Sequence, residues 1–218
     1  MPTPTVKKAD KPHRVAIIGG GPAGITAGFV LAKAGHAATI FEGEKELGGV
    51  LRTGIPVYRL DRKVLDREIK AVLDLGVEAR CGEFLDQDRF AALEDEYDAV
   101  VLSMGLQWLR GLKVPGAELD GIEQGIQFLH RVNLEGEQKL SGHVVVLGGG
   151  NTAMDCARSA LRAGAERVTV AYRRTLLEMP AIREEIEEAE AEGIELLMQR
   201  QPIAFRGNGK VGEIELAE

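Results

Sequence analysis

The chain has 218 residues and a formal net charge of −7, and 44% of its residues are hydrophobic while 28% are charged. This balance is typical of an ordinary globular protein that is long enough for two modest domains or one large one. The acidic charge argues against nucleic acid as a main partner, because no basic stripe is present to neutralise phosphates.

The cysteines and the apolar runs narrow the protein class further. Cys81 and Cys156 are the only cysteines and form no C-x-x-C pair. Neither a disulfide framework nor a thiol redox couple is therefore indicated, and an iron–sulfur cluster held by this chain alone is excluded. We expect both cysteines to be small buried residues. No apolar run reaches the roughly 18 residues of a membrane span, and the polar start lacks a signal-peptide core. We therefore expect a cytoplasmic protein with no membrane partner.

The first predicted elements form a β-α-β unit. Residues 1–13, rich in proline and lysine, predict a flexible lead-in. The apolar run 15–18 predicts a buried parallel strand, and a glycine-rich turn then opens a predicted helix over residues 23–34, which Gly35 ends. A second buried strand is predicted over residues 38–41.

The composition of the segment after this unit indicates that it lines a ligand pocket. Residues 47–56 are too glycine-rich for a regular element and unusually apolar for a surface loop. An amphipathic helix is predicted over residues 61–75, with Gly76 as its stop. A short strand, a helical turn and a buried strand that ends on a glycine are then predicted over residues 77–81, 90–96 and 98–105.

The second half of the chain predicts another β-α-β unit. Pro115-Gly116 marks a linker, and a helix is predicted over residues 122–133. The second unit spans residues 144–172, with its helix over residues 152–163. Pro180 is expected to begin an acidic helix over residues 181–192 whose six glutamates form a solvated face. A hairpin is predicted to close the sequence, with arms at residues 195–205 and 211–216.

Together these elements predict an α/β fold with two Rossmann-like dinucleotide-binding units, each with a parallel sheet. We expect a first domain over residues 14–112 and a second over residues 113–218, the second incomplete at its C-terminus because its final strand is missing. The two glycine turns start 129 residues apart. In each, one glycine permits the tight turn, one lets backbone approach a pyrophosphate, and the last position lets helix and strand pack closely.

The residue about 23 positions after the first glycine of each turn predicts which nucleotide binds. Glu42 follows the second strand of the first unit, where a carboxylate accepts hydrogen bonds from an unphosphorylated ribose. Arg173 and Arg174 stand at the matching place in the second unit, where guanidiniums bind a 2′-phosphate. The first site is therefore predicted to bind FAD or NAD, and the second NADPH.

The chain resembles the glutamate synthase small-subunit family of FAD- and NADPH-dependent oxidoreductases. The resemblance rests on Gly19-Gly-Gly-Pro-Ala-Gly24, Glu42, Gly48-Gly49, the segment from Gly54 to Leu60, Ser103-Met-Gly105, Gly148-Gly-Gly-Asn-Thr-Ala-Met-Asp155 and Tyr172-Arg-Arg174. It implies that the first turn and its ribose acid bind FAD, through Gly19, Gly21, Pro22, Ala23, Gly24 and Glu42. It further implies that the flavin is lined by Gly49, Leu51, Arg59 and Gly105, and that NADPH is bound by Gly148, Gly150, Asn151, Thr152, Arg173 and Arg174.

The resemblance also implies hydride transfer from NADPH through FAD to a partner oxidoreductase subunit or an iron–sulfur protein. Such transfer requires no acid–base residue from the protein, so no catalytic residue is predicted. The four histidines lack metal-ligand spacing, so no metal site is predicted either. A second hypothesis is a truncated, catalytically silent NADP(H)-binding fragment that does not retain FAD, because the flavin-contacting segment that family members carry is not found. A thioredoxin-reductase-like enzyme is disfavoured by the lack of a C-x-x-C pair.

Overall fold

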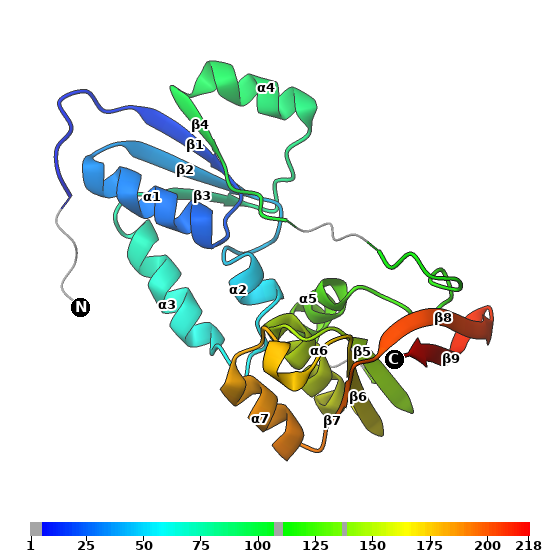
Figure 1. Ribbon diagram of the computed structural model, residues 1–218. Helices are drawn as coiled ribbons and strands as arrows, with labels where there is room; N and C mark the ends of the chain where they lie inside the picture. Colours follow the sequence, from blue (N-terminus) through cyan, green and yellow to red (C-terminus); the bar gives the residue numbers. More distant parts are fainter. Residues whose placement is uncertain (1–5, 107–110, 137–138) are drawn as a thin grey trace. The chain divides into compact units, whose positions relative to one another are not determined.

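The structure, a computed structural model, describes residues 6–106, 111–136 and 139–218. The first five residues of the predicted lead-in lie outside these ranges. The chain divides into two compact units (Figure 1): residues 1–53 with 57–106, and residues 54–56 with 107–218. Each unit is built on its own parallel sheet, which confirms the predicted α/β fold.

The first unit contains a four-stranded sheet in the order β3-β2-β1-β4. Every neighbouring pair of strands is parallel. Its strands are β1 (Arg14–Ile18), β2 (Ala37–Glu42), β3 (Glu78–Cys81) and β4 (Ala99–Leu102). Its helices are α1 (Pro22–Ala34), α2 (Val50–Thr53), α3 (Arg62–Leu73) and α4 (Gln87–Glu96).

Both faces of the central strands β1 and β2 are covered, which explains why these two strands are apolar without alternation. Ile17 and Ile40 pair in register and pack with α1 and α3 on one face. Ala16 and Phe41 pack with Leu93 of α4 on the other face (Figure 1). The strands are therefore held between two helical layers.

Three sequence predictions in this unit are corrected. The loop over residues 47–56 contains the short helix α2. The helical turn predicted at 90–96 is a full helix from Gln87, because the Asp86 carboxylate caps it by accepting the N–H of Arg89 at 2.8 Å. Cys81, predicted to be buried, is exposed at the end of β3, since this short strand is mostly open to solvent.

The second unit contains a three-stranded parallel sheet in the order β5-β6-β7 and a separate antiparallel hairpin, β8-β9. Its strands are β5 (His143–Leu147), β6 (Arg167–Tyr172), β7 (Glu195–Met198), β8 (Gln201–Asn208) and β9 (Lys210–Ala217). Its helices are α5 (Gly125–Glu135), α6 (Asn151–Arg162), the 3-10 helix η1 (Leu176–Glu178) and α7 (Arg183–Ala191).

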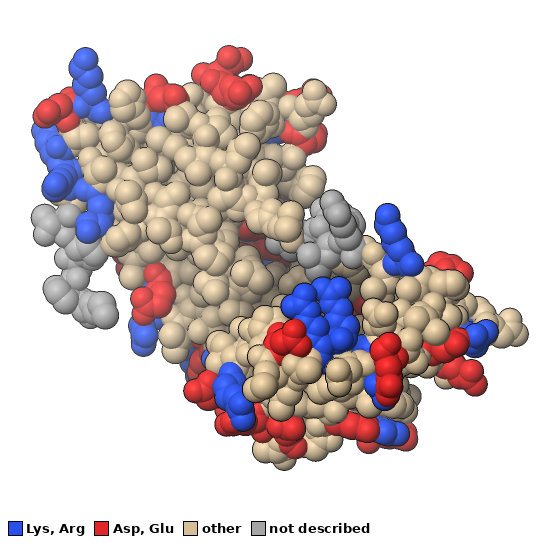
Figure 2. Space-filling model, viewed as in Figure 1, with Lys and Arg blue, Asp and Glu red and all other residues tan. Residues whose placement is uncertain are grey.

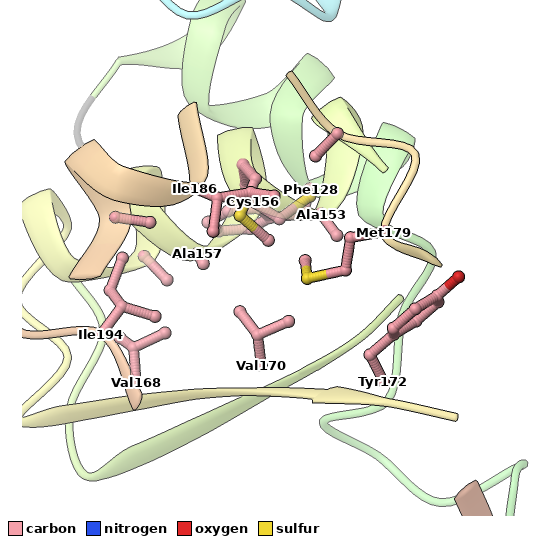
Figure 3. Packing of buried hydrophobic residues seen from close by; sticks show 14 of the residues in the cluster. Phe128, Ala153, Cys156, Ala157, Val168, Val170, Tyr172, Met179, Ile186 and Ile194 are labelled. Carbon is pink, nitrogen blue, oxygen red and sulfur yellow. The ribbon is translucent and has the colours of Figure 1, made fainter. Parts of the chain in front are cut away.

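The core of this unit is formed by the sheet and the helices α5, α6 and α7. Figure 3 shows Val168 and Val170 of β6 facing Ala157 of α6 and Ile186 of α7. Met154 and Val170 are fully buried. Small residues along α6 let this helix lie close to the strands, which holds its first turn at the carboxyl end of β5.

The predicted closing hairpin is partly wrong. Residues 195–198 form the third parallel strand, because Gln199 adopts a left-handed backbone conformation with φ of 55° and ends it. The hairpin itself comprises residues 201–208 and 210–217 and turns at Gly209, whose φ is +74°.

The acidic helix begins three residues later than predicted, at Arg183 rather than at Pro180. Two hydrogen bonds to the second glycine turn hold the intervening residues: Ala181 N–H donates to the Gly149 carbonyl at 3.1 Å, and Ile182 N–H to Asn151 Oδ1 at 2.8 Å. These bonds keep residues 181 and 182 out of the helix.

Candidate functional site

The first glycine turn is fixed by backbone contacts that only glycine permits. Gly19 has φ of +102°, and a Cβ there would lie 2.4 Å from the Ser103 carbonyl oxygen. A Cβ on Gly24 would lie 1.9 Å from the Gly19 carbonyl oxygen. The Ser103 hydroxyl lies 2.9 Å from the carbonyl oxygens of both Ile18 and Gly19, so β4 holds the turn from the side. Gly19 and Gly24 are therefore required by packing.

Gly21 is different, because a Cβ there meets nothing closer than the Gly49 Cα at 3.7 Å. Gly21 is the N-cap of α1 and Pro22 takes the first helical position. The first turn of α1 contains no acidic side chain, and Pro22 and Ala23 are exposed. The positive end of the helix thus faces open space beside Gly21, where an anion can approach the backbone.

Glu42 lies at this turn. Its Oε2 accepts the Gly20 N–H at 2.7 Å, and its Oε1 accepts the Glu44 N–H at 2.8 Å. The side chain is half-buried at the carboxyl end of β2. Each carboxylate oxygen retains a further acceptor position for a hydroxyl group. The predicted ribose acid is therefore beside the predicted phosphate turn.

The loop 47–53 packs against the same turn. Gly48 N–H donates to the Gly20 carbonyl at 2.8 Å, and a Cβ on Gly49 would lie 2.6 Å from the Gly21 Cα. Leu51 follows within α2 and is half-buried. The structure thus brings Gly49 to Gly21. Arg59 is half-exposed in the segment after α2, and Gly105 is exposed, two residues beyond Ser103.

Two arginines that the sequence analysis missed hold this loop. Arg52 is buried; its Nε donates to the Leu47 carbonyl at 2.8 Å, and its guanidinium pairs with Asp66 of α3. Arg62 donates to the Leu51 carbonyl at 3.0 Å and to the Arg52 carbonyl at 2.8 Å. Burial, with the neighbouring Arg52 charge, lowers the pKa of Arg62. An arginine inside an apolar glycine-rich loop, shortly before an acid-bearing helix, is the signal that indicates such an anchor.

The second glycine turn repeats the arrangement at the end of β5. Gly148 has φ of +150° and donates its N–H to the Ala171 carbonyl at 3.1 Å. A Cβ on Gly149 would lie 2.6 Å from the Tyr172 ring, so this ring supports the turn. Gly150 is the N-cap of α6, whose first turn contains no acidic residue and includes the exposed Thr152.

Asn151 connects this turn to the segment after β6. Its Oδ1 accepts the Ile182 N–H at 2.8 Å, so the amide oxygen is used within the protein and the amide NH2 group remains the part with donors to offer. Tyr172 adds a second connection, because its hydroxyl donates to the Glu178 carbonyl at 2.9 Å. In Figure 3 the Tyr172 ring lies at the end of β6 beside Met179 of this segment.

Arg173 and Arg174 follow directly on Tyr172, and both are exposed. Within the described ranges neither side chain forms an ion pair. The Arg174 carbonyl accepts the Gln199 N–H at 3.1 Å, which fixes the backbone. Figure 2 shows one cluster of Lys and Arg atoms over the second unit, with Asp and Glu atoms around it, and further Lys and Arg atoms along the edge of the first unit. Two guanidiniums are thus available to an anion.

The prediction that the six glutamates of residues 181–192 form a solvated face is only partly right: Glu184, Glu187, Glu188 and Glu190 are exposed, but three of the six pair with an arginine of α6. Arg158 of α6, with a side chain 7% exposed, pairs with Glu185 at 2.9 Å, Glu188 at 2.6 Å and Glu192 at 2.8 Å. Arg162 also pairs with Glu192, and these two arginines lower the pKa of that carboxyl to about 2, Arg162 contributing most. The acidic run therefore binds α7 to α6.

Cys156, possible metal ligands and possible membrane spans remain to be considered. Cys156 is buried, and burial raises the pKa of its thiol to about 12. In the described part of the chain, no three His, Cys, Asp or Glu side chains form a possible metal site. A search of the same residues finds no helix with both the length and the apolar character of a membrane span.

Known proteins are similar to this chain in sequence and in fold. The beta subunit of an NADP(+)-dependent formate dehydrogenase from Moorella thermoacetica is 46% identical over 188 residues, which are 83% of this chain and 26% of that protein. The NADPH glutamate synthase small chain of Halomonas elongata is 38% identical over 219 residues, 93% of this chain and 45% of that protein. The chain thus spans less than half of either relative.

A solved structure with the same fold is that of FprA from Mycobacterium tuberculosis in complex with NADPH. It matches with a TM-score of 0.81 at 21% identity, over 94% of this chain and 63% of that one. A family model described as pyridine nucleotide-disulphide oxidoreductase matches residues 13–218. With the resemblance to glutamate synthase small chains confirmed by sequence identity, the chain belongs to the pyridine nucleotide-disulphide oxidoreductase family.

Proposed function

We propose that this chain is an NADPH-dependent flavoprotein oxidoreductase. Residues 14–112 would bind FAD and residues 113–218 would bind NADPH. The observation that carries the proposal is the contrast between two equivalent turns: Glu42 follows β2 in one unit, while Arg173 and Arg174 follow β6 in the other. A carboxylate suits a free ribose and repels a 2′-phosphate, whereas paired guanidiniums attract it.

The first turn fits the pyrophosphate and ribose of FAD. Space is open beside Gly21, the positive end of α1 faces it, and Glu42 is already oriented by two backbone N–H groups. Gly19, Gly21, Pro22, Ala23 and Gly24 would provide the cradle, and Glu42 would accept hydrogen bonds from the ribose hydroxyls. Gly49, Leu51, Arg59 and Gly105 would contact the flavin half of the molecule.

The second turn fits NADPH on the same grounds. Gly148, Gly150 and Thr152 lie at the positive end of α6, where the pyrophosphate would bind. Asn151 would donate from its amide nitrogen, since its oxygen is bound to Ile182. Arg173 and Arg174 would bind the 2′-phosphate through charge-assisted hydrogen bonds.

The bound cofactors supply hydride chemistry, so the task of this chain is to bind and orient them. Arg52 and Arg62 would keep the loop 47–53 against the first turn, and Tyr172 would keep the second turn in place. Electrons would pass to a partner subunit. The relatives named as a formate dehydrogenase beta subunit and a glutamate synthase small chain support this step.

Reconstitution tests the proposal. The purified chain is mixed with FAD, separated from free cofactor and examined under anaerobic conditions. We expect a retained flavin absorbing at about 450 nm that bleaches with NADPH and much more slowly with NADH. A colourless protein that still binds NADPH would show that the chain is an NADP(H)-binding fragment and not a flavoprotein.

A further inference from the structure

A carboxylate is placed four residues after Arg174, in a segment proposed to attract phosphate. Glu178 belongs to a capping box at η1: Thr175 Oγ1 donates to Glu178 Oε2 at 2.8 Å, and Thr175 N–H donates to the same oxygen at 3.1 Å. The Thr175 side chain in turn accepts the Glu178 N–H. Both acceptor bonds therefore hold the carboxylate against Thr175.

The Glu178 carboxylate is within electrostatic range of Arg174. The two hydrogen bonds from Thr175, the backbone one foremost, and the Arg174 charge together lower the pKa of Glu178. Even so, Glu178 and Arg174 form no ion pair within the part of the chain that the structure describes. The carboxylate is thus bound to Thr175 while it interacts electrostatically with the Arg174 guanidinium.

Hydrogen bonds hold the backbone of residues 174–182 in place. Tyr172 OH holds the Glu178 carbonyl, Gln199 N–H holds the Arg174 carbonyl, and Ile182 N–H is bound to Asn151. The backbone on both sides of the box is therefore anchored. The Glu178 side chain can still change its rotamer, and the hydrogen bond from the Thr175 hydroxyl restrains this change.

Resting on the proposed function, we propose that Thr175 is a positioning residue that sets the preference for a 2′-phosphorylated nucleotide. Its hydroxyl sequesters the Glu178 carboxylate and so leaves Arg174 to the 2′-phosphate. Without the hydroxyl, the Glu178 carboxylate keeps only the bond from the Thr175 N–H, so it swings more readily to Arg174 and neutralises the charge that the phosphate requires.

The experiment measures binding of 2′,5′-ADP and 5′-AMP to the full chain by calorimetry. These probes differ in the 2′-phosphate alone. Thr175→Ala is expected to weaken 2′,5′-ADP about fivefold and to leave 5′-AMP unchanged. Adding Glu178→Gln to Thr175→Ala is expected to restore 2′,5′-ADP to within about twofold of the wild type, because a neutral amide cannot neutralise Arg174.

Two controls isolate the electrostatic mechanism. Thr175→Ser keeps the hydroxyl and should bind like the wild type. Glu187→Gln, added to Thr175→Ala, removes the same charge from an exposed pair with Arg183 on α7 and should restore nothing. Restoration by both Glu178→Gln and Glu187→Gln would overturn the assignment to Glu178.

The other outcomes are equally decisive. A loss with Thr175→Ala that Glu178→Gln does not restore would mean a merely structural role for the box and would overturn the inference while the proposed function stands. Unchanged binding with Thr175→Ala would do the same. A wild-type chain that binds 2′,5′-ADP no more tightly than 5′-AMP would overturn the NADPH assignment itself, and the inference with it.

Discussion

The glycines of the first turn have separate physical tasks, although they belong to one motif. Gly24 has no room for a Cβ because the Gly19 carbonyl lies 1.9 Å from its position. Gly21 has that room, since its nearest neighbour is 3.7 Å away and its φ of −80° is open to other residues. Packing therefore does not require a glycine at position 21, and we propose that ligand binding does.

This distinction predicts opposite results for two alanine substitutions. Gly24→Ala forces β1 and α1 apart and should cost about 1 to 3 kcal/mol of unfolding free energy. Gly21→Ala should change stability by less than about 1 kcal/mol, because the reduced freedom of the unfolded chain opposes the poorer N-cap, while FAD binding should weaken at least tenfold as the methyl group occupies the space of the pyrophosphate. Urea denaturation and FAD titration measure the two effects. Equal FAD binding in Gly21→Ala and the wild type would refute a pyrophosphate at this position.

The residues of the candidate site could be predicted where they follow a strand. Glu42 and the arginine pair each come directly after a buried strand, so their place at the carboxyl end of a sheet follows from the topology. Arg52, Arg62 and the Thr175–Glu178 box could not be predicted in the same way. Their roles depend on which carbonyl or carboxylate the folded loop brings within reach, and the spacing of residues does not specify this.

Among the helices, α7 shows how tertiary contacts overrule a local pattern. The sequence predicts that the glutamates of residues 181–192 form a solvated face, yet three of them pair with the buried Arg158 of α6. The helix also starts late because Asn151 and Gly149 hold the residues before it. Strand and helix positions follow from apolar runs and glycine stops, but the end points follow from contacts between elements.

The Arg158 network predicts a large effect of one substitution. Arg158→Leu leaves the partner carboxylates of α7 without their buried cation and should cost about 3 kcal/mol of unfolding free energy. Arg183→Ala, which breaks an exposed pair on the same helix, should cost less than about 1 kcal/mol. Thermal or urea unfolding provides the comparison. A similar small cost for both variants would show that the network is not stabilising.

Glu192 makes the same network dependent on pH. Its pKa falls from an ordinary value of 4.5 to about 2 in the folded chain, so its ionisation favours the folded state above about 4.5. This contribution is lost as the pH falls from 4.5 toward about 2. Wild-type stability should therefore decline more steeply over this window than that of Glu192→Gln. Parallel pH profiles for the two proteins would contradict the assigned ion pairs.

At the scale of the whole molecule, the two units share one arrangement of strand, glycine turn and helix. They differ in the charge of the residues that follow the second strand. Both units place a glycine turn between a strand of a parallel sheet and a helix without acids in its first turn. We propose that each turn binds a pyrophosphate and that the residue after the next strand selects the ribose. Membership of the pyridine nucleotide-disulphide oxidoreductase family agrees with this arrangement.

The most direct test of this division exchanges the two determinants separately and measures both ligands on each variant. Glu42→Arg should abolish FAD retention and leave 2′,5′-ADP binding unchanged. Arg173→Ala with Arg174→Ala should weaken 2′,5′-ADP by about 1 to 3 kcal/mol per lost contact and leave FAD content and 5′-AMP binding unchanged. If either variant impaired both ligands equally, or impaired the ligand assigned to the other unit, the two turns would not divide the cofactors as described.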